Sequence, residues 1–360
     1  MTFPSLILDS DTAKRNIKKM TRKASDLNVE FRPHFKTHQS LEVGKWFRNE
    51  GVKAITVSSV KMAEFFSQDS WKDITIAFPV SIHDVHRLNE LCSTVTVNIL
   101  AVDAQTLKEF DGKLTNKLGI YIELDPGYGR SGIPINDFFT LDDLKSVVEQ
   151  SEHLIFKGFY THAGHSYKCR NKQEIQELVG PILDQLTNLK EHFDDPICFG
   201  DTPSCSVLDS FGPIDQISPG NFVFYDWTQT KINSCSEEDI AVAMFCHVVA
   251  KYPKRNQLLI HGGAVHFSKD NFPDNDDNPY FGIVAQKTDN GWGASIPGNI
   301  LSSISQEHGT ITCTPEFFDQ VNVGDIIPIL PIHSCLTADL MGEYASIEGI
   351  SIDHMTRKTF

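Results

Sequence analysis

The stretch Arg32-Pro33-His34-Phe35-Lys36-Thr37-His38-Gln39 organises this chain. It follows a short apolar run, residues 29–31, which predicts a strand with Lys36 just past its carboxyl end. Histidines flank the lysine at even spacing, and neighbouring basic groups make a lysine lose its proton more easily. Such a lysine can form a Schiff base with a carbonyl group. A basic loop that binds a substrate phosphate or carboxylate would have the same composition, so both interpretations stay open at this point.

Strand-like runs alternate with helical patterns from this stretch to about residue 220. The runs with the length and composition of strands are residues 29–31, 54–57, 74–78, 95–100, 118–124, 154–160, 197–199 and 216–218. Strands that alternate with helices predict βαβ units around a parallel sheet, which is an α/β fold. Eight such units predict a closed (β/α)8 TIM-type barrel. A doubly wound open sheet is the alternative.

The pattern changes after residue 239. Strand-like runs continue, but Gly, Pro, Asn and Asp fill the gaps between them in place of helical patterns. These runs are residues 240–250, 258–261, 281–286, 311–314 and 326–330. They predict a smaller antiparallel β domain behind the barrel.

Composition excludes several classes of protein. The 47 acidic residues outnumber the 32 basic ones and give a net charge of −15, which argues against partners such as nucleic acid or an anionic membrane surface. No apolar run reaches the roughly 18 residues that a membrane span needs, and no export signal is visible at the start. The eight cysteines are scattered without a C-x-x-C pair, which predicts reduced thiols in the cytoplasm.

Two predicted strands end in residues that can contact a ligand. The run Asp125-Pro126-Gly127-Tyr128-Gly129-Arg130-Ser131-Gly132 lets the backbone approach a ligand while the arginine forks onto an oxygen atom. The run Tyr160-Thr161-His162-Ala163-Gly164-His165 carries two histidines, which can bind metal, act as acid and base, or pair with carboxylates. The alternatives are a glycine-rich loop with a surface arginine, and histidines with a purely structural role.

Short polar segments follow the last two predicted strands of the barrel. They are Gly200-Asp201-Thr202-Pro203-Ser204 and Pro219-Gly220-Asn221. Exposed backbone N–H groups and hydroxyls at this end of a barrel can hold a phosphate group. Two ordinary turns would have the same composition.

Near the C-terminus, Pro331-Ile332-His333-Ser334-Cys335 places a histidine and a cysteine two residues apart. In an extended segment two such side chains lie on one face, so His333 and Cys335 can bind the same ion. Imidazole with thiolate suits zinc, and two protein ligands leave positions open for water and substrate. The alternative is a buried cysteine beside a surface histidine.

Several of these motifs resemble those of the D-threonine aldolase and D-serine dehydratase family, which are pyridoxal phosphate enzymes with the alanine-racemase fold. The resemblance rests on R-P-H-x-K-T-H, D-x-G-x-x-R-x-G, the G-H step, G-x-T-P-S, P-G and H-x-C-L-T, and it recurs along most of the chain. It implies a barrel over residues 10–238 and a β domain formed by residues 1–9 and 239–360. Alanine racemases place an arginine facing the pyridine nitrogen where this chain has Ser218, so the resemblance assigns that nitrogen no partner here.

The resemblance also implies roles for single residues. Lys36 forms the Schiff base and removes the α-proton, and His165 is the candidate base near the substrate hydroxyl, with His162 as the second choice. The implied cofactor contacts are Lys36, Arg130, Tyr160, Gly200, Thr202, Ser204, Gly220 and Asn221. The implied ligands of a divalent metal, zinc or else manganese, are His333 and Cys335; aldolases of this family usually carry aspartate at the second position.

These roles predict a pyridoxal-phosphate- and metal-dependent lyase acting on a D-3-hydroxy amino acid. The match of Cys335 to the dehydratases favours β-elimination, which would convert D-serine into pyruvate and ammonia. The alternatives are cleavage of D-threonine or another 3-hydroxy-D-amino acid by an aldolase reaction, a metal-free amino-acid racemase, and a non-catalytic cofactor-binding protein. The family further implies a homodimer with sites between one subunit's barrel and the other's β domain.

Two further segments resemble parts of the family pattern. The segment Glu307-His308-Gly309 matches one of them. The segment Gly262-Gly263-Ala264-Val265-His266-Phe267-Ser268 lies where many members carry D-x-G-x-K, and two of its side chains differ from that pattern.

Overall fold

The computed structural model describes residues 3–274 and 276–356, and its contacts divide the chain into two units. The barrel unit comprises residues 18–36 and 44–220, and the β unit comprises residues 1–17, 37–43 and 221–360. The predicted domain boundaries, 10–238 for one domain and 1–9 with 239–360 for the other, stay a prediction. Residues 1, 2, 275 and 357–360 of that predicted β domain lie outside the described residues. Within the described ranges, no helix is both long and apolar enough to cross a membrane.

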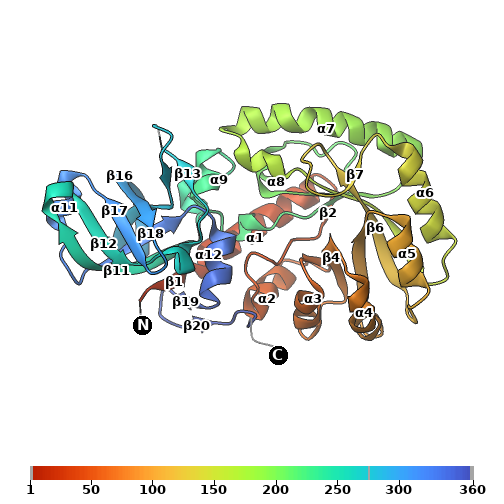
Figure 1. Ribbon diagram of the computed structural model, residues 1–360, viewed down its shortest axis with the longest axis horizontal. Coiled ribbons are helices and arrows are strands. Elements are labelled where there is room, and N and C mark those ends of the chain that lie inside the picture. Colours follow the sequence, from red (N-terminus) through yellow and green to blue (C-terminus); the bar gives the residue numbers. More distant parts are fainter. Residues whose placement is uncertain (1–2, 275, 357–360) are drawn as a thin grey trace. The chain divides into compact units, whose positions relative to one another are not determined.

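The barrel unit is built on parallel strands in the order β2-β10-β9-β8-β6-β5-β4-β3 (Figure 1). Its two ends meet at a parallel bridge between His34 and Thr56, where Phe35 N donates to Thr56 O at 2.8 Å. The predicted TIM-type barrel is therefore confirmed, and it closes just before Lys36. The strands are β2 (Glu30–Phe31), β3 (Ile55–Val57), β4 (Asp73–Pro79), β5 (Thr96–Ala101), β6 (Leu118–Asp125), β8 (Leu154–His162), β9 (Ile197–Gly200) and β10 (Gln216–Ile217).

Helices follow the strands in the order that βαβ units require. The helix after β3, for example, is capped by Ser59, whose hydroxyl accepts the N–H of Met62, and it buries Val60, Met62, Ala63 and Phe66. A short strand, β7 (Ile133–Pro134), pairs with β6 outside the main path. The helices up to residue 220 are α1 (Ser10–Asp26), α2 (Leu41–Asn49), α3 (Val60–Ser67), α4 (Val85–Cys92), α5 (Ala104–Asp111), α6 (Phe138–Glu149), α7 (Lys172–Phe193) and α8 (Thr202–Val207).

Arg32, the first residue of the lysine motif, is part of the barrel interior. The residue is 3% exposed, and its guanidinium forks onto Asp73, with Nη1 and Nη2 donating to the two carboxylate oxygens at 2.8 and 3.0 Å. Asn98 Nδ2 donates to the same carboxylate at 2.9 Å. A buried guanidinium needs this bidentate partner, because an unpaired charge in the interior is costly. Arg32 thus fixes β2, the strand that leads to Lys36.

The β unit contains a sheet in the order β12-β17-β16-β15-β18-β11-β1-β19-β20, whose pairs are antiparallel except for the parallel pair β1–β19. Because β12 also pairs with β11, six of these strands form a closed circuit, which protects their edges (Figure 1). As the resemblance implied, the N-terminal strand β1 joins this unit through β11. The strands are β1 (Ser5–Leu8), β11 (Val242–Tyr252), β12 (Gln257–His261), β15 (Gly282–Thr288), β16 (Gly291–Ile304), β17 (His308–Thr312), β18 (Ile326–Pro331), β19 (Tyr344–Ser346) and β20 (Ser351–Ile352).

The sequence pattern did not predict the long strand β16 or the short strands β13 (Phe272–Pro273), β14 (Pro279–Tyr280), β19 and β20, and it placed one other strand a few residues away from its position. The 14 residues of β16 contain glycine, proline and serine, which are typical of loops, but the strand pairs with β15 on one side and β17 on the other. The strand predicted over residues 311–314 lies at His308–Thr312 instead. The remaining elements are the hairpin of β13 and β14, and helices α9 (Trp227–Lys231), α10 (Ala264–Phe267), α11 (Pro315–Gln320) and α12 (Ser334–Met341).

Candidate active site

The carboxyl ends of the barrel strands bring Lys36, Arg130 and His162 together. Lys36 follows β2, Arg130 lies in the loop after β6, and His162 ends β8. Burial, together with the positive charges of Lys36 and Arg130, lowers the pKa of His162 to about 3. The imidazole is therefore neutral, beside two cationic side chains at the end of the barrel where such folds keep their chemistry.

A row of hydroxyl groups crosses the same end of the barrel. Tyr160 Oη donates to Ser218 Oγ at 3.3 Å, and Ser218 Oγ donates to Thr56 Oγ1 at 2.8 Å. Burial raises the pKa of Tyr160, so its phenol keeps its proton. Glycine at position 200 avoids crowding the Tyr160 hydroxyl, because a Cβ there would lie only 3.2 Å from Tyr160 Oη. These groups are all uncharged, in contrast to the arginine that alanine racemases place at the position of Ser218.

The loop after β6 and the segment after β8 hold His165 beside Tyr128. The two rings are stacked with centroids 5.7 Å apart. The guanidinium carbon of Arg130 lies 5.6 Å from the centroid of the Tyr128 ring. Gly164 permits this contact, because a Cβ there would lie 2.5 Å from Tyr128. His165 Nδ1 is buried and has no hydrogen-bond partner among the described residues, and burial lowers the pKa of this histidine. A neutral imidazole with an uncommitted nitrogen can accept a proton.

The segment after β9 leads into a short helix. One backbone N–H group of the predicted phosphate-binding segment, that of Ser204, already donates a hydrogen bond within the protein. Asp201 Oδ1 accepts the backbone N–H of Ser204 at 2.7 Å and the hydroxyl of Ser166 at 2.9 Å. Ser204 Oγ, by contrast, is buried and has no partner among the described residues. Buried hydroxyls normally have a partner, so this one fits a bound oxygen atom. Thr202 and Gly200 lie on the same segment.

His333 and Cys335 lie at the start of helix α12 rather than on an extended segment, so the predicted strand geometry is wrong. His333 is the residue that precedes the helix, and Cys335 belongs to its first turn. The two side chains still interact: burial raises the pKa of Cys335, but the hydrogen bond and charge of His333, together with the hydrogen bond of Thr37, bring it below its usual value. Thiolate beside imidazole is the donor set that a zinc ion requires.

Asp270 is a candidate site residue that the sequence did not indicate. Its Oδ2 lies 2.6 Å from His333 Nδ1. Burial opposes protonation of His333, but the hydrogen bond to Asp270 and the interaction with Cys335 raise its pKa to about 10. A carboxylate on Nδ1 fixes the orientation of the ring and leaves Nε2 for a metal, as is usual for histidine ligands. Asp270 is 63 residues from His333, and no spacing pattern connects them.

Polar side chains of the β unit surround the thiol of Cys335. Thr37 Oγ1 lies 3.2 Å from the sulfur, and Asn221 Nδ2 donates to it at 3.4 Å. Buried Asp226 in turn accepts from Asn221 Nδ2 at 2.6 Å and from Ser334 N at 3.0 Å. The side-chain amide of Asn221 thus donates to Cys335 and Asp226. If Asn221 contacts a cofactor phosphate, as predicted, the contact would be made by its backbone and not by this amide.

The predicted site residues therefore form two groups, each within one unit. The barrel unit carries Lys36, Arg130, Tyr160, His162, His165, Gly200, Thr202, Ser204 and Gly220. The β unit carries Asn221, His333 and Cys335. The chain passes from the barrel unit to the β unit directly after Lys36 and again directly after Gly220.

Comparison with known proteins agrees with this arrangement. Residues 8–224 match the family described as "Alanine racemase, N-terminal domain", and residues 241–347 match the family described as "Putative serine dehydratase domain". A D-serine dehydratase of Dictyostelium discoideum is 31% identical over 370 residues, which cover 94% of this chain and 91% of the relative. A 3-hydroxy-D-aspartate aldolase of Paracoccus denitrificans is 24% identical and covers 97% of this chain and 89% of its own.

Solved structures share the fold at lower sequence identity. The D-threo-3-hydroxyaspartate dehydratase from Delftia sp. HT23 has a TM-score of 0.89 at 22% identity and covers 99% of this chain and 98% of its own. An alanine racemase of Clostridium difficile has a TM-score of 0.66 at 10% identity and covers 99% of this chain and all of its own. With a barrel of the alanine-racemase type and a full-length relative above 30% identity, this chain belongs to the D-serine dehydratase family of alanine-racemase-fold proteins.

Proposed function

We propose that this protein is a pyridoxal-phosphate- and divalent-metal-dependent lyase that removes water from D-3-hydroxy amino acids, with D-serine as its main substrate. The observation that carries the proposal is the pair of His333 and Cys335, with Asp270 2.6 Å from His333 Nδ1. A thiolate and a carboxylate-oriented imidazole have little use in a racemase without metal. The full-length similarity to a D-serine dehydratase supports the same reaction.

The barrel residues fit pyridoxal phosphate. The buried, unpartnered Ser204 hydroxyl suits a phosphate oxygen, and Lys36 lies at a strand end beside neutral His162. When bound through Lys36, the cofactor withdraws electrons from the α-carbon of an amino acid. In this proposal Lys36 accepts the α-proton, and Tyr160 with Ser218 offers hydroxyl groups, not a cation, to the pyridine ring.

The residues of the β unit fit a zinc ion. Asp270 holds His333 Nδ1, so Nε2 is the ring nitrogen left to bind a metal beside Cys335, whose pKa is lowered. A D-threo-3-hydroxyaspartate dehydratase with a cysteine-to-alanine substitution has been solved in a metal-free form, which agrees with a cysteine ligand in this fold. Zinc would act as a Lewis acid on a hydroxyl oxygen and make it a better leaving group. Zinc as the ion, the homodimer and the cytoplasmic location stay predictions.

Aldol cleavage is a second candidate, and His165 favours it. Cleavage needs a base that takes the proton of the substrate hydroxyl, and His165 has a lowered pKa and an unpartnered Nδ1 among the described residues. The similarity to a 3-hydroxy-D-aspartate aldolase points the same way. Elimination remains first, because that similarity is lower than the similarity to the D-serine dehydratase.

The products from D-threonine distinguish the two reactions. The holoenzyme, purified with pyridoxal phosphate and zinc, is incubated with D-serine, D-threonine and the L-isomers as controls. Elimination should give pyruvate from D-serine and 2-oxobutanoate from D-threonine, each with ammonia. If D-threonine gives glycine and acetaldehyde but no keto acid, the protein is an aldolase and not a dehydratase. Interconversion of D- and L-isomers without other products would indicate a racemase.

A further inference from the structure

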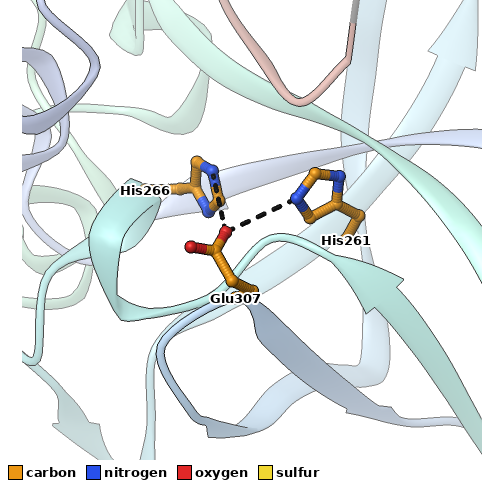
Figure 2. A group of neighbouring side chains, drawn as sticks. All are labelled: His261, His266 and Glu307. Carbon is orange, nitrogen blue, oxygen red and sulfur yellow. Dashed lines mark ion pairs between the residues drawn. The ribbon is translucent and has the colours of Figure 1, made fainter.

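A second cluster of metal-binding side chains lies in the β unit, apart from the residues assigned above. It consists of His261 at the end of β12, His266 in α10 and Glu307 in the turn before β17. One ligand atom from each residue lies within 4.8 Å of the other two. Figure 2 shows both imidazole rings facing one carboxylate oxygen. Neither the lysine motif nor the pair His333–Cys335 includes these residues.

The distances are close to those of a coordinated ion. His261 Nε2 lies 3.5 Å and His266 Nε2 3.9 Å from Glu307 Oε2. Ligand atoms at about 2.1 Å from a tetrahedral ion lie about 3.4 Å from one another. The side chains therefore need only small movements to share an ion.

The backbone holds the two turns that carry these residues in fixed register. Gly262 N donates to Glu307 O at 3.0 Å, Ala264 N to Ser305 O at 2.7 Å, and Val265 N to Gln306 O at 3.2 Å. These bonds place the loop of His261 and His266 directly against the turn of Glu307. Pre-arranged ligands lower the conformational entropy that binding costs.

Glycine allows this close approach. A Cβ at Gly263 would lie 2.4 Å from the carbonyl oxygens of Ser305 and Gln306, and one at Gly309 would lie 2.4 Å from Gly262 O. Any side chain at either glycine would push the two turns apart, and with them the histidines and the carboxylate. His266 and Gly263 both belong to the segment 262–268, which differs from the family pattern. The part of the chain that departs from the pattern is thus also the part that forms this cluster.

From this geometry we propose that His261, His266 and Glu307 form a second site for a divalent transition metal, made of other side chains than the pair His333–Cys335. Two imidazoles and one carboxylate select zinc, nickel or cobalt over magnesium and calcium. The side chains of His261 and Glu307 are 47% and 48% exposed, so water can complete the coordination shell. Three protein ligands with an open position can hold a structural or a water-activating ion.

The hydrogen bond of His266 adds a specific consequence. Its Nδ1 accepts the N–H of Gly263 at 3.1 Å, so the neutral ring carries its proton on Nε2, on the side of Glu307. The neutral ring has a single N–H proton, so an ion that binds Nε2 requires this proton to leave Nε2 and a proton to be taken up on Nδ1. Metal binding should therefore change the tautomer of His266 and break its bond to Gly263, whereas a simple ion pair with Glu307 should not.

Equilibrium dialysis of the holoenzyme against zinc, followed by elemental analysis, tests the site. We expect two ions per chain in the wild type and one in Cys335→Ala, which keeps only the second site. His261→Ala and Glu307→Gln should each hold one; both leave the Gly263 bond to His266 in place, so the fold is not at risk. His86→Ala is the matched control, because His86 Nε2 lies 3.4 Å from Glu90 on an exposed helix and should bind as the wild type does.

The tautomer is read independently by NMR of Cys335→Ala labelled with 15N-histidine. Zinc should move the His266 proton from Nε2 to Nδ1, and Glu307→Gln in the same background should prevent the change. Wild-type ion content in His261→Ala and Glu307→Gln, together with an unchanged His266 signal, would overturn the proposal. The result does not depend on the reaction, because a protein without lyase activity could still bind this ion.

Discussion

Replacing Asp270 tests whether the carboxylate 2.6 Å from His333 Nδ1 supports a metal ligand. In Asp270→Asn the amide oxygen can still accept the Nδ1 proton, so the ring keeps its orientation and loses only the negative charge. Asp270→Ala removes both the charge and the hydrogen bond. Asp276→Asn removes one negative charge from the turn between β13 and β14, a few residues along the chain, and serves as the control.

The size of the effect follows from the exposure of the pair. Loss of a group that orients a metal ligand costs about 10- to 100-fold in metal affinity. The Asp270 side chain is 51% exposed, so solvent screens its charge and the lower part of this range applies. We expect about tenfold weaker zinc binding in Asp270→Asn, roughly 1.4 kcal/mol, and a larger loss in Asp270→Ala.

Zinc affinity is measured by competition with a chromophoric chelator, and pyruvate formation from D-serine is followed at saturating and limiting zinc. Excess zinc should restore most of the activity of Asp270→Asn, because the defect lies in binding the ion. Wild-type zinc affinity in Asp270→Ala would show that the carboxylate does not support a metal ligand.

Three further predictions concern single residues. Lys36→Ala should lose the absorption band of the bound cofactor and its borohydride-stable label; labelling of another lysine at wild-type yield would contradict the assignment. Cys335→Asp should keep an ion and turn D-threonine partly into glycine and acetaldehyde, whereas Cys335→Ala should lose the catalytic ion and lyase activity; a fully active Cys335→Ala protein would exclude the thiolate as a ligand. Burial and the charges of Lys36 and Arg130 lower the pKa of His162 to about 3, so between pH 6.5 and 3 the unfolded chain takes up a proton that the folded protein does not. As the pH is lowered through that range, the free energy of unfolding should therefore fall by about 1.4 kcal/mol per pH unit. Urea titrations of His162→Asn should show a smaller dependence on pH, and an unchanged dependence would mean that His162 is not buried in its neutral form.

The sequence by itself determined the barrel and the placement of Lys36. Buried parallel strands are short apolar runs bounded by turn residues, and each of the eight runs is a local signal that needs no knowledge of its neighbours. The end of a strand is equally local, so the positions of Lys36, Arg130 and His162 after their strands followed directly. The same logic failed for β16, since its glycines and proline are typical of a loop, and only pairing on both sides makes it a strand.

Only the tertiary structure decided what surrounds the metal-binding side chains. Asp270 reaches His333 across 63 residues, and Glu307 reaches His261 through contacts between two separate turns. Such contacts depend on how loops fold back, which no periodic pattern records. The start of α12 is a similar case: the spacing of His333 and Cys335 suits a strand as well as a helix end, and the packing of the chain chose the helix. Residue types with the right chemistry are visible in a sequence, but the distances that let them act together arise only when distant segments meet.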